Sequence, residues 1–157
     1  FKDLTVGIID GIPDTANKLR GQTISGSSKD ILDEYAKEYN LDWNIQDGEI
    51  IISPINTPIS NSEAILITSA TGMIGSPTVT EIGVDITTLL NPSLLPNRAF
   101  TVESIFADVQ LGNLFFRSRD TVRTTGEGNY KIQEVLFKGD THAQDWISKV
   151  KGRIINA

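Results

Sequence analysis

His142, in the segment GDTHAQD, is the one histidine that the chain offers for acid–base chemistry. Asp140 and Asp145 lie within three residues of it, and Ser and Thr nucleophiles occur throughout the chain, so the parts of a triad are present. The neighbours of His142 are equally the residue types that favour turns. We therefore expect an exposed or turn-stabilising histidine. One histidine without cysteine cannot give the usual zinc ligands, so we expect no metal site.

Carboxylates and glycine turns are the other candidates for chemistry. Asp33, Glu34 and Glu38 fall on one predicted helix, where a solvated face is the ordinary explanation. We expect no carboxylate whose surroundings raise its pKa towards a catalytic range. The segments TGMIGSP and GEG contain close glycines but neither a GxGxxG nor a GxxxxGK[ST] pattern. From these residues we expect no enzyme and no cofactor.

A basic segment, FFRSRDTVRTT (residues 115–125), sets Arg117, Arg119 and Arg123 beside aromatic residues. Such a combination can hold single-stranded nucleic acid. Charged residues at a strand edge also discourage aggregation. We favour a strand edge or a protein interface for these arginines.

The stretch TGMIGSPTVTEIGVDITTLLNPSLLP (residues 71–96) contains one Glu and one Asp and no Lys, Arg, His or Cys. Charged residues are depleted at the centre of protein interfaces. From the residues alone, the stretch could cradle a ligand, form turns inside a β domain or present a surface that another protein covers. If it is such a surface, the candidate interface residues are Met73, Ile74, Pro77, Leu89, Leu90, Leu94 and Leu95.

A helix is predicted over about residues 28–39, in the first half of the chain. Ser27 is the expected N-cap, apolar residues recur at helical spacing after it, and Asn40 can end the helix. Asp33 is expected on the solvated face. A hairpin over about 41–53 turns at Asp47-Gly48 and pairs Trp43 with Ile52. The opening segment LTVGIID is a candidate third strand.

The rest of the chain contains short strand-like runs at even spacing, which are typical of a small barrel or sandwich. Two longer strands close the chain. In the second, Trp146, Ser148, Val150, Gly152 and Ile154 should face inward, and the intervening lysines outward. The predicted fold class is α+β: a small helix-on-hairpin α/β domain (1–55), a linker (56–63) and an antiparallel β-barrel-like domain (64–157).

Composition excludes several classes of protein. The hydrophobic share of 39% and the charged share of 22% are typical of a globular chain. No apolar run is long enough for a membrane span, so no membrane anchoring is expected. Residues 1–90 hold 13 Asp and Glu against 5 Lys and Arg, which argues against a dedicated nucleic-acid domain. The chain begins with Phe1 rather than Met, so we expect a processed product or a piece cut from a longer polypeptide.

Several segments together resemble one known family. They are SGSSKDILDEYAKEYNLDWNIQDGEIIISP, TGMIGSPTVTEIGVDITTLLNPSLLP, FTVES and GNYKIQEVLFKGDTHAQDWISKVKG. In this order, the segments resemble the baseplate hub, or 43-kDa tail protein, family of contractile-tailed bacteriophages and prophages. The resemblance extends from about Gly26 to Gly152.

The resemblance implies a structural role in the virion rather than catalysis. Three copies would form a ring that joins the tail tube protein to the central spike protein, in a baseplate assembled in the host cytoplasm. DNA would be a partner only as passing cargo, and the three arginines could face its channel. The alternative is a carbohydrate-type ligand-binding β module that uses Trp43 or Trp146 as a stacking surface, although burial is the simpler expectation for both.

Overall fold

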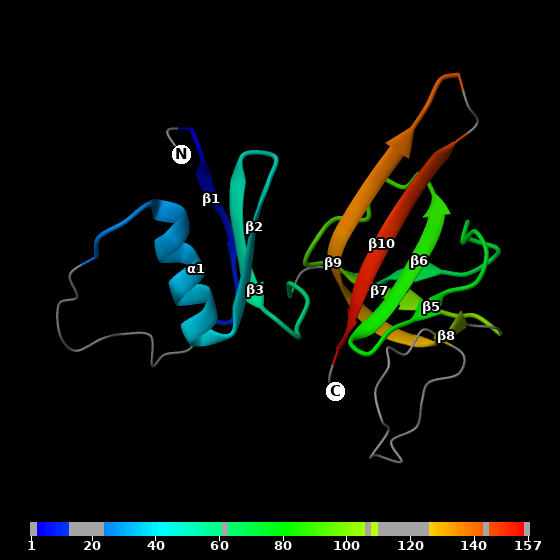
Figure 1. Cartoon of the computed structure of the whole chain (residues 1–157), viewed down its shortest axis with the longest axis horizontal. Coiled ribbons are helices and arrows are strands. Elements are labelled where there is room, and N and C mark those ends of the chain that lie inside the picture. The colour runs from blue at the N-terminus through cyan, green and yellow to red at the C-terminus, as the bar shows by residue number, and fades with distance from the viewer. Residues whose placement is uncertain are drawn as a thin grey trace, which may run out of the picture. The chain divides into compact units, whose positions relative to one another are not determined.

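The computed structural model describes residues 3–12, 24–60, 63–105, 126–142 and 145–155, together with the backbone of 108–109. These residues form two compact units that divide after Ser60. Figure 1 shows a helix beside a sheet in the first unit and a larger sheet in the second. The described part of the first unit contains one helix and three strands. The described chain is α+β, as predicted, with strands predominating. Whether each unit is a separately folding domain stays a prediction.

The helix α1 spans Ser28–Tyr39, and local interactions cap both of its ends. The Ser27 hydroxyl oxygen accepts a hydrogen bond from the Asp30 backbone N–H at 3.2 Å. The same hydroxyl donates to the Asp30 carboxylate at 2.6 Å, which lowers the pKa of that carboxyl. Asn40 adopts a left-handed backbone (φ 53°) and ends the helix. Both caps are where the sequence predicts them.

The first unit has a three-stranded sheet with the order β1-β3-β2. Its strands are β1 (Thr5–Ile9), β2 (Leu41–Gln46) and β3 (Glu49–Pro54). Asp47 and Gly48 both have positive φ, as a two-residue hairpin turn requires, and Trp43 pairs with Ile52 as predicted. β1 pairs in parallel with β3, so the candidate opening strand does join the hairpin.

α1 runs along one face of this sheet (Figure 1). The Trp43 indole N–H donates to the Asp33 carboxylate at 2.9 Å and so ties the helix to β2. The prediction that Asp33 lies on a solvated face is therefore wrong. Helical spacing assigns a side chain to a face, but it does not show that an indole on the next strand can reach round to that face.

The second unit is a curled sheet of seven strands in the order β4-β7-β9-β10-β6-β5-β8. Its strands are β4 (Ile65–Ile67), β5 (Thr78–Val79), β6 (Gly83–Leu89), β7 (Ala99–Val102), β8 (Asp108–Val109), β9 (Gly128–Gly139) and β10 (Trp146–Ile154). The antiparallel prediction is only partly right, because β4 pairs with β7, and β5 with β8, in parallel. Among the described strands the order is open, ending at β4 and β8.

The longest pairing in this sheet is the β9–β10 hairpin. Along β10, Ser148, Val150 and Gly152 are buried and Lys149 and Lys151 are exposed. This alternation confirms the predicted inward and outward faces at the centre of the strand, whereas Trp146, also predicted to face inward, is exposed. The inward face of the hairpin therefore builds the core, and the outward face carries the charge.

The core of the second unit lies on the inner side of the curl. It consists of Ile67, Met73, Val84, Ile86, Leu94, Phe100, Val102, Tyr130, Ile132 and Val150. The rings of Phe100 and Tyr130 stack with their centroids 5.5 Å apart. Gly152 faces them, and a Cβ atom there would lie 3.1 Å from Cβ of Tyr130 and closer still to the Phe100 ring. Glycine at this position lets β10 cross directly over the two rings.

Candidate interaction surface

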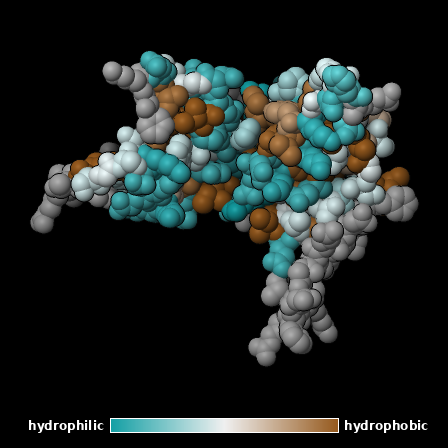
Figure 2. Space-filling model, turned by 45° about the horizontal axis from the view of Figure 1, so that its top comes forward, coloured by the Kyte–Doolittle hydropathy of each residue, from teal (hydrophilic) through white to brown (hydrophobic). Residues whose placement is uncertain are grey.

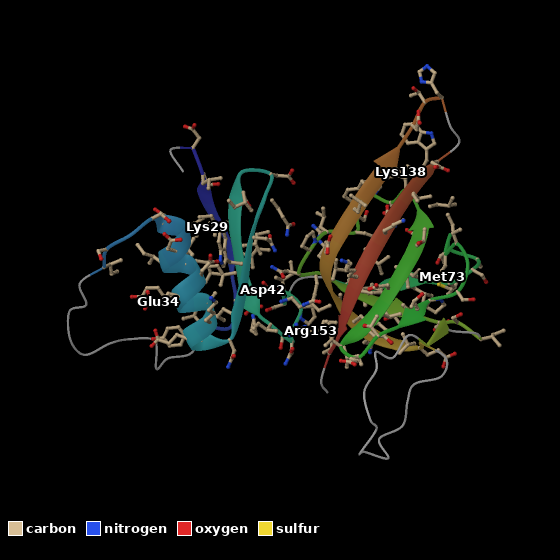
Figure 3. All side chains as sticks on the ribbon, in the orientation of Figure 1. Lys29, Glu34, Asp42, Met73, Lys138 and Arg153 are labelled. Atoms are coloured by element: carbon tan, nitrogen blue, oxygen red, sulfur yellow. The ribbon has the colours of Figure 1, made fainter. Side chains whose placement is uncertain are left out.

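The stretch of residues 71–96 supplies β5, β6 and the turns on either side of them. The structure separates its seven candidate interface residues into a buried group and an exposed group, with Leu95 between them. Met73, Pro77 and Leu94 are buried within the unit, and Met73 lies beside β6 (Figure 3). Leu95 is half-buried. Ile74, Leu89 and Leu90 remain exposed by 43%, 60% and 39%.

The buried members face inward because the turn before β5 folds back over the sheet. The Met73 backbone N–H donates to the Thr68 carbonyl at 2.9 Å, and Met73 forms a bridge with Thr88 on β6. Leu94 is fully buried in the core. These side chains present no surface to a partner in this structure, so the predicted interface is left with the exposed group and the half-buried Leu95.

The exposed group is held by the backbone at the end of β6. The Ile74 N–H donates to the Thr87 carbonyl at 2.7 Å, and the Leu89 N–H donates to the Gly72 carbonyl at 2.8 Å. The Leu90 N–H donates to the Trp146 carbonyl at 2.9 Å. Three apolar side chains are thus held exposed around the end of β6, although burying them would be favourable. Exposed apolar surface at Ile74 and Leu89 suits a protein contact.

The outer face of β6, β10 and β9 extends this patch in three cross-strand rows. Side chains directly opposite each other in a sheet lie on the same face. The rows are Leu89–Ile147–Lys138, then Thr87–Lys149–Leu136, then Asp85–Lys151–Glu134. A shallow groove of about 270 Å³ runs along the second and third rows.

Ion pairs neutralise two of these rows. Lys138 contacts Asp145 at 2.6 Å, which lowers the pKa of Asp145, and Lys151 contacts Glu134 at 2.8 Å, which raises the pKa of Lys151. Figure 3 shows Lys138 near the free end of the hairpin. Lys149, in the middle row, has Thr87 and Leu136 as its cross-strand neighbours. It therefore presents a positive charge among apolar and hydroxyl groups.

Asp85 bears on one expectation from the sequence. Burial raises its pKa above the usual value, the Lys151 ammonium opposes that shift, and Glu134 adds to it. The shift is upward, and the prediction that no carboxylate reaches a catalytic range stays a prediction. The neighbours that bury Asp85 come from other strands of the sheet, so the local sequence GVDIT does not reveal them.

His142 lies at the tip of the β9–β10 hairpin with 96% of its side chain exposed. Its backbone N–H donates to the Asp140 carboxylate at 2.8 Å, and its ring nitrogen Nδ1 lies 3.2 Å from the Thr141 hydroxyl. Asp145 is bound by Lys138 instead. The structure thus confirms an exposed histidine in a turn. Arg117, Arg119 and Arg123 lie outside the described residues, so their predicted roles stay predictions.

A comparison with protein-family models gives a match over residues 12–116 to the family described as baseplate hub gp41. The matched range is about two thirds of the chain and draws on both units. The chain belongs to the baseplate hub gp41 family. The predicted resemblance to phage baseplate hubs is thereby confirmed. A search of curated proteins gives no match.

Membership of the baseplate hub family indicates a structural protein of the phage tail, located in the virion and associated with other tail components. The family is one of structural proteins, which favours a role other than catalysis. In the part of the chain that the structure describes, no helix is long and apolar enough to cross a membrane.

Proposed function

We propose that this chain is a structural segment of the phage baseplate hub, and that three copies form a ring joining the tail tube to the central spike. The family match over residues 12–116 carries the proposal. It assigns the chain to hub proteins, and a hub is the part of a baseplate where tube and spike have to be connected.

The exposed apolar group supports contacts between copies. Ile74, Leu89 and Leu90 lie at the surface beside a stretch with two charged residues in 26. A neighbouring copy that covers them would remove this apolar area from water, which stabilises a complex by about 25 cal/mol for each Å². Closure of the curled sheet into a full barrel, alone or with strands from a neighbour, belongs to the same proposal.

The remaining features follow from the hub role. The spike and tube proteins are the proposed partners, and assembly takes place in the host cytoplasm. DNA passes the ring as cargo, with Arg117, Arg119 and Arg123 as candidate channel residues. No cofactor, metal or membrane anchor takes part in this function.

Light scattering on the protein expressed from its complete reading frame tests the ring. The expected mass is that of a trimer, alone or with the cognate spike and tube proteins. Leu89→Asp should shift the equilibrium towards monomer, because it would bury a charge in the contact. Ile45→Asp is the matched control, since Ile45 on β2 of the other sheet is 42% exposed. A monomer under all these conditions would contradict the proposal.

A second candidate function rests on Trp146. Its side chain is 48% exposed, so the expectation that it is buried is wrong, and its ring lies across Gly139 on the neighbouring strand. An exposed indole face is what a carbohydrate-binding module uses for stacking. Trp43 is half-buried, and its indole N–H donates to Asp33. Quenching of Trp146 fluorescence by host-surface glycans, lost in Trp146→Ala, would favour this function.

A further inference from the structure

The chain that follows β3 is fastened to the first unit at both of its ends. The Ile55 backbone N–H donates to the Asn40 carbonyl at 3.0 Å, directly after β3. The Ser60 backbone N–H donates to the Asp10 carboxylate at 3.0 Å, and the Ser60 hydroxyl donates to the same carboxylate oxygen. We call residues 55–60, which lie between these two fastenings, the strap.

The Asp10 carboxylate is held in place by the backbone that carries it. The Asp10 N–H donates to the Ile52 carbonyl on β3 at 2.9 Å, which continues the parallel pairing of β1 with β3. The next residue, Gly11, has φ 68°, and a Cβ atom there would overlap the Pro54 ring. The two bonds from Ser60 lower the pKa of Asp10, so the carboxyl is an ionised acceptor at neutral pH.

The strap can open without disturbing either sheet. None of its residues belongs to a strand, and Ser60 is exposed, so water can replace the bonds that Ser60 makes. Burial of Ile59 opposes opening, so the open form is a minor one. Figure 2 shows a surface on which apolar and hydrophilic residues are mixed, and the strap, INTPIS, has the same mixed character. A released strap is therefore compatible with water.

The strap sets how much free chain joins the two units. The first unit ends at Ser60 and β4 begins at Ile65, so the four residues 61–64 separate the fastened end from the second sheet. Releasing the strap adds up to six residues to this connector. An extended residue spans at most about 3.3–3.6 Å, so the reach of the connector rises from roughly 14 Å to roughly 35 Å.

We propose that the contact between Asp10 and Ser60 is a clasp that controls the length of the connector between the two units. When the clasp is closed, the connector is short. When it is open, the units can take up a wider range of relative positions without unfolding. The proposed ring uses neither residue, so this inference holds or fails independently of the number of copies in the hub.

Hydrogen exchange tests the clasp in the protein expressed from its complete reading frame. Asp10→Ala removes the acceptor, and the strap amides should then exchange about fivefold faster or more. Asp3→Ala is the matched control, because it removes an exposed carboxylate just before β1. If Asp10→Ala unfolds the first unit, Ser60→Ala decides instead, since it removes only the hydroxyl bond and should give a smaller increase. Strap exchange equal to that of the Asp3→Ala control would overturn the inference.

Distances between spin labels on the two units report on the connector itself. Glu34→Cys on α1 and Lys149→Cys on β10 provide exposed labelling positions, and the chain has no cysteine of its own. Labelled protein is diluted with unlabelled protein, so that both measured labels belong to one copy. The distribution of distances should broaden in Asp10→Ala and stay unchanged in Asp3→Ala. Faster strap exchange without a broader distribution would also overturn the inference, because the clasp would then not control the connector.

Discussion

Adding one carbon atom at Gly152 should destabilise the second unit, because the space beside this residue is already filled. It lies on β10 opposite the stacked rings of Phe100 and Tyr130, which are both fully buried. A Cβ atom at Gly152 would lie 2.6 Å from Cε1 of Phe100 and 3.1 Å from Cβ of Tyr130. Carbon atoms in contact prefer about 3.5–4.0 Å, so Gly152→Ala must displace an aromatic ring that has no free space around it.

The expected loss is a balance of two effects. Overpacking a well-filled core costs about 1–3 kcal/mol. Replacing glycine by alanine restricts the unfolded chain and returns about 0.4–1 kcal/mol. We expect Gly152→Ala to lower the free energy of unfolding by about 2 kcal/mol, towards the upper end of the range that these two effects allow. A loss of that size lowers Tm by roughly 10 °C in a unit of this size.

Tryptophan fluorescence can report this change for the second unit alone. The chain has two tryptophans, and Trp43→Phe leaves Trp146 on β10 as the reporter. Urea titration in this background gives the free energy of unfolding. Gly139→Ala is the matched control, because its Cβ atom would approach only the Trp146 ring, at 2.9 Å. That ring is half-exposed and can tilt away, so we expect a loss below about 0.5 kcal/mol.

A double substitution tests whether contact with Phe100 causes the loss of stability in Gly152→Ala. Phe100→Leu removes the ring atoms nearest to Gly152, and on its own it should cost about 1–2 kcal/mol as a large-to-small core change. Combined with Gly152→Ala it should cost clearly less than the sum of the two, with a coupling of about 1 kcal/mol. Strict additivity, or no loss from Gly152→Ala alone, would refute this account of the core.

Three further predictions concern single interactions. Asp33→Ala leaves the half-buried Trp43 indole N–H without its acceptor and should lower the free energy of unfolding of the first unit by about 1 kcal/mol. Circular dichroism at 222 nm measures this loss, with Glu34→Ala as the control. Ser27→Ala removes the N-cap and should cost about 1 kcal/mol in the same assay, whereas Ser27→Asn should cost little. Burial raises the pKa of Asp85 above 3.8, so its ionised form destabilises the fold. Asp85→Asn should therefore increase the free energy of unfolding near pH 7. This gain should disappear as the pH falls below 3.8, where the carboxyl is protonated in both the folded and the unfolded chain. Equal stability of Asp85→Asn and the unsubstituted protein at pH 7 would contradict the last of these.

Local signals in the sequence correctly predicted the elements whose geometry depends on a few adjacent residues. The cap residues Ser27 and Asn40 bound α1, and the Asp47-Gly48 turn set the β2–β3 register, because both depend on backbone conformations of a few adjacent residues. The alternation along β10 separated buried from exposed side chains for the same reason, since neighbouring residues of a strand face opposite ways. The motifs that resemble phage baseplate hubs also identified the family that the comparison shows.

Contacts between segments distant along the chain were decided only by the tertiary structure. The parallel pairing of β4 with β7 joins strands more than 30 residues apart, and no local pattern specifies the direction of such a pair. The 71–96 stretch has a uniform composition, yet the fold buries Met73 and Leu94 and exposes Leu89, because burial depends on which strands lie opposite. The raised pKa of Asp85 likewise arises from strand neighbours in space. Adjacent residues thus determined the local conformations, and the assembled sheets determined which side chains remain free to meet a partner.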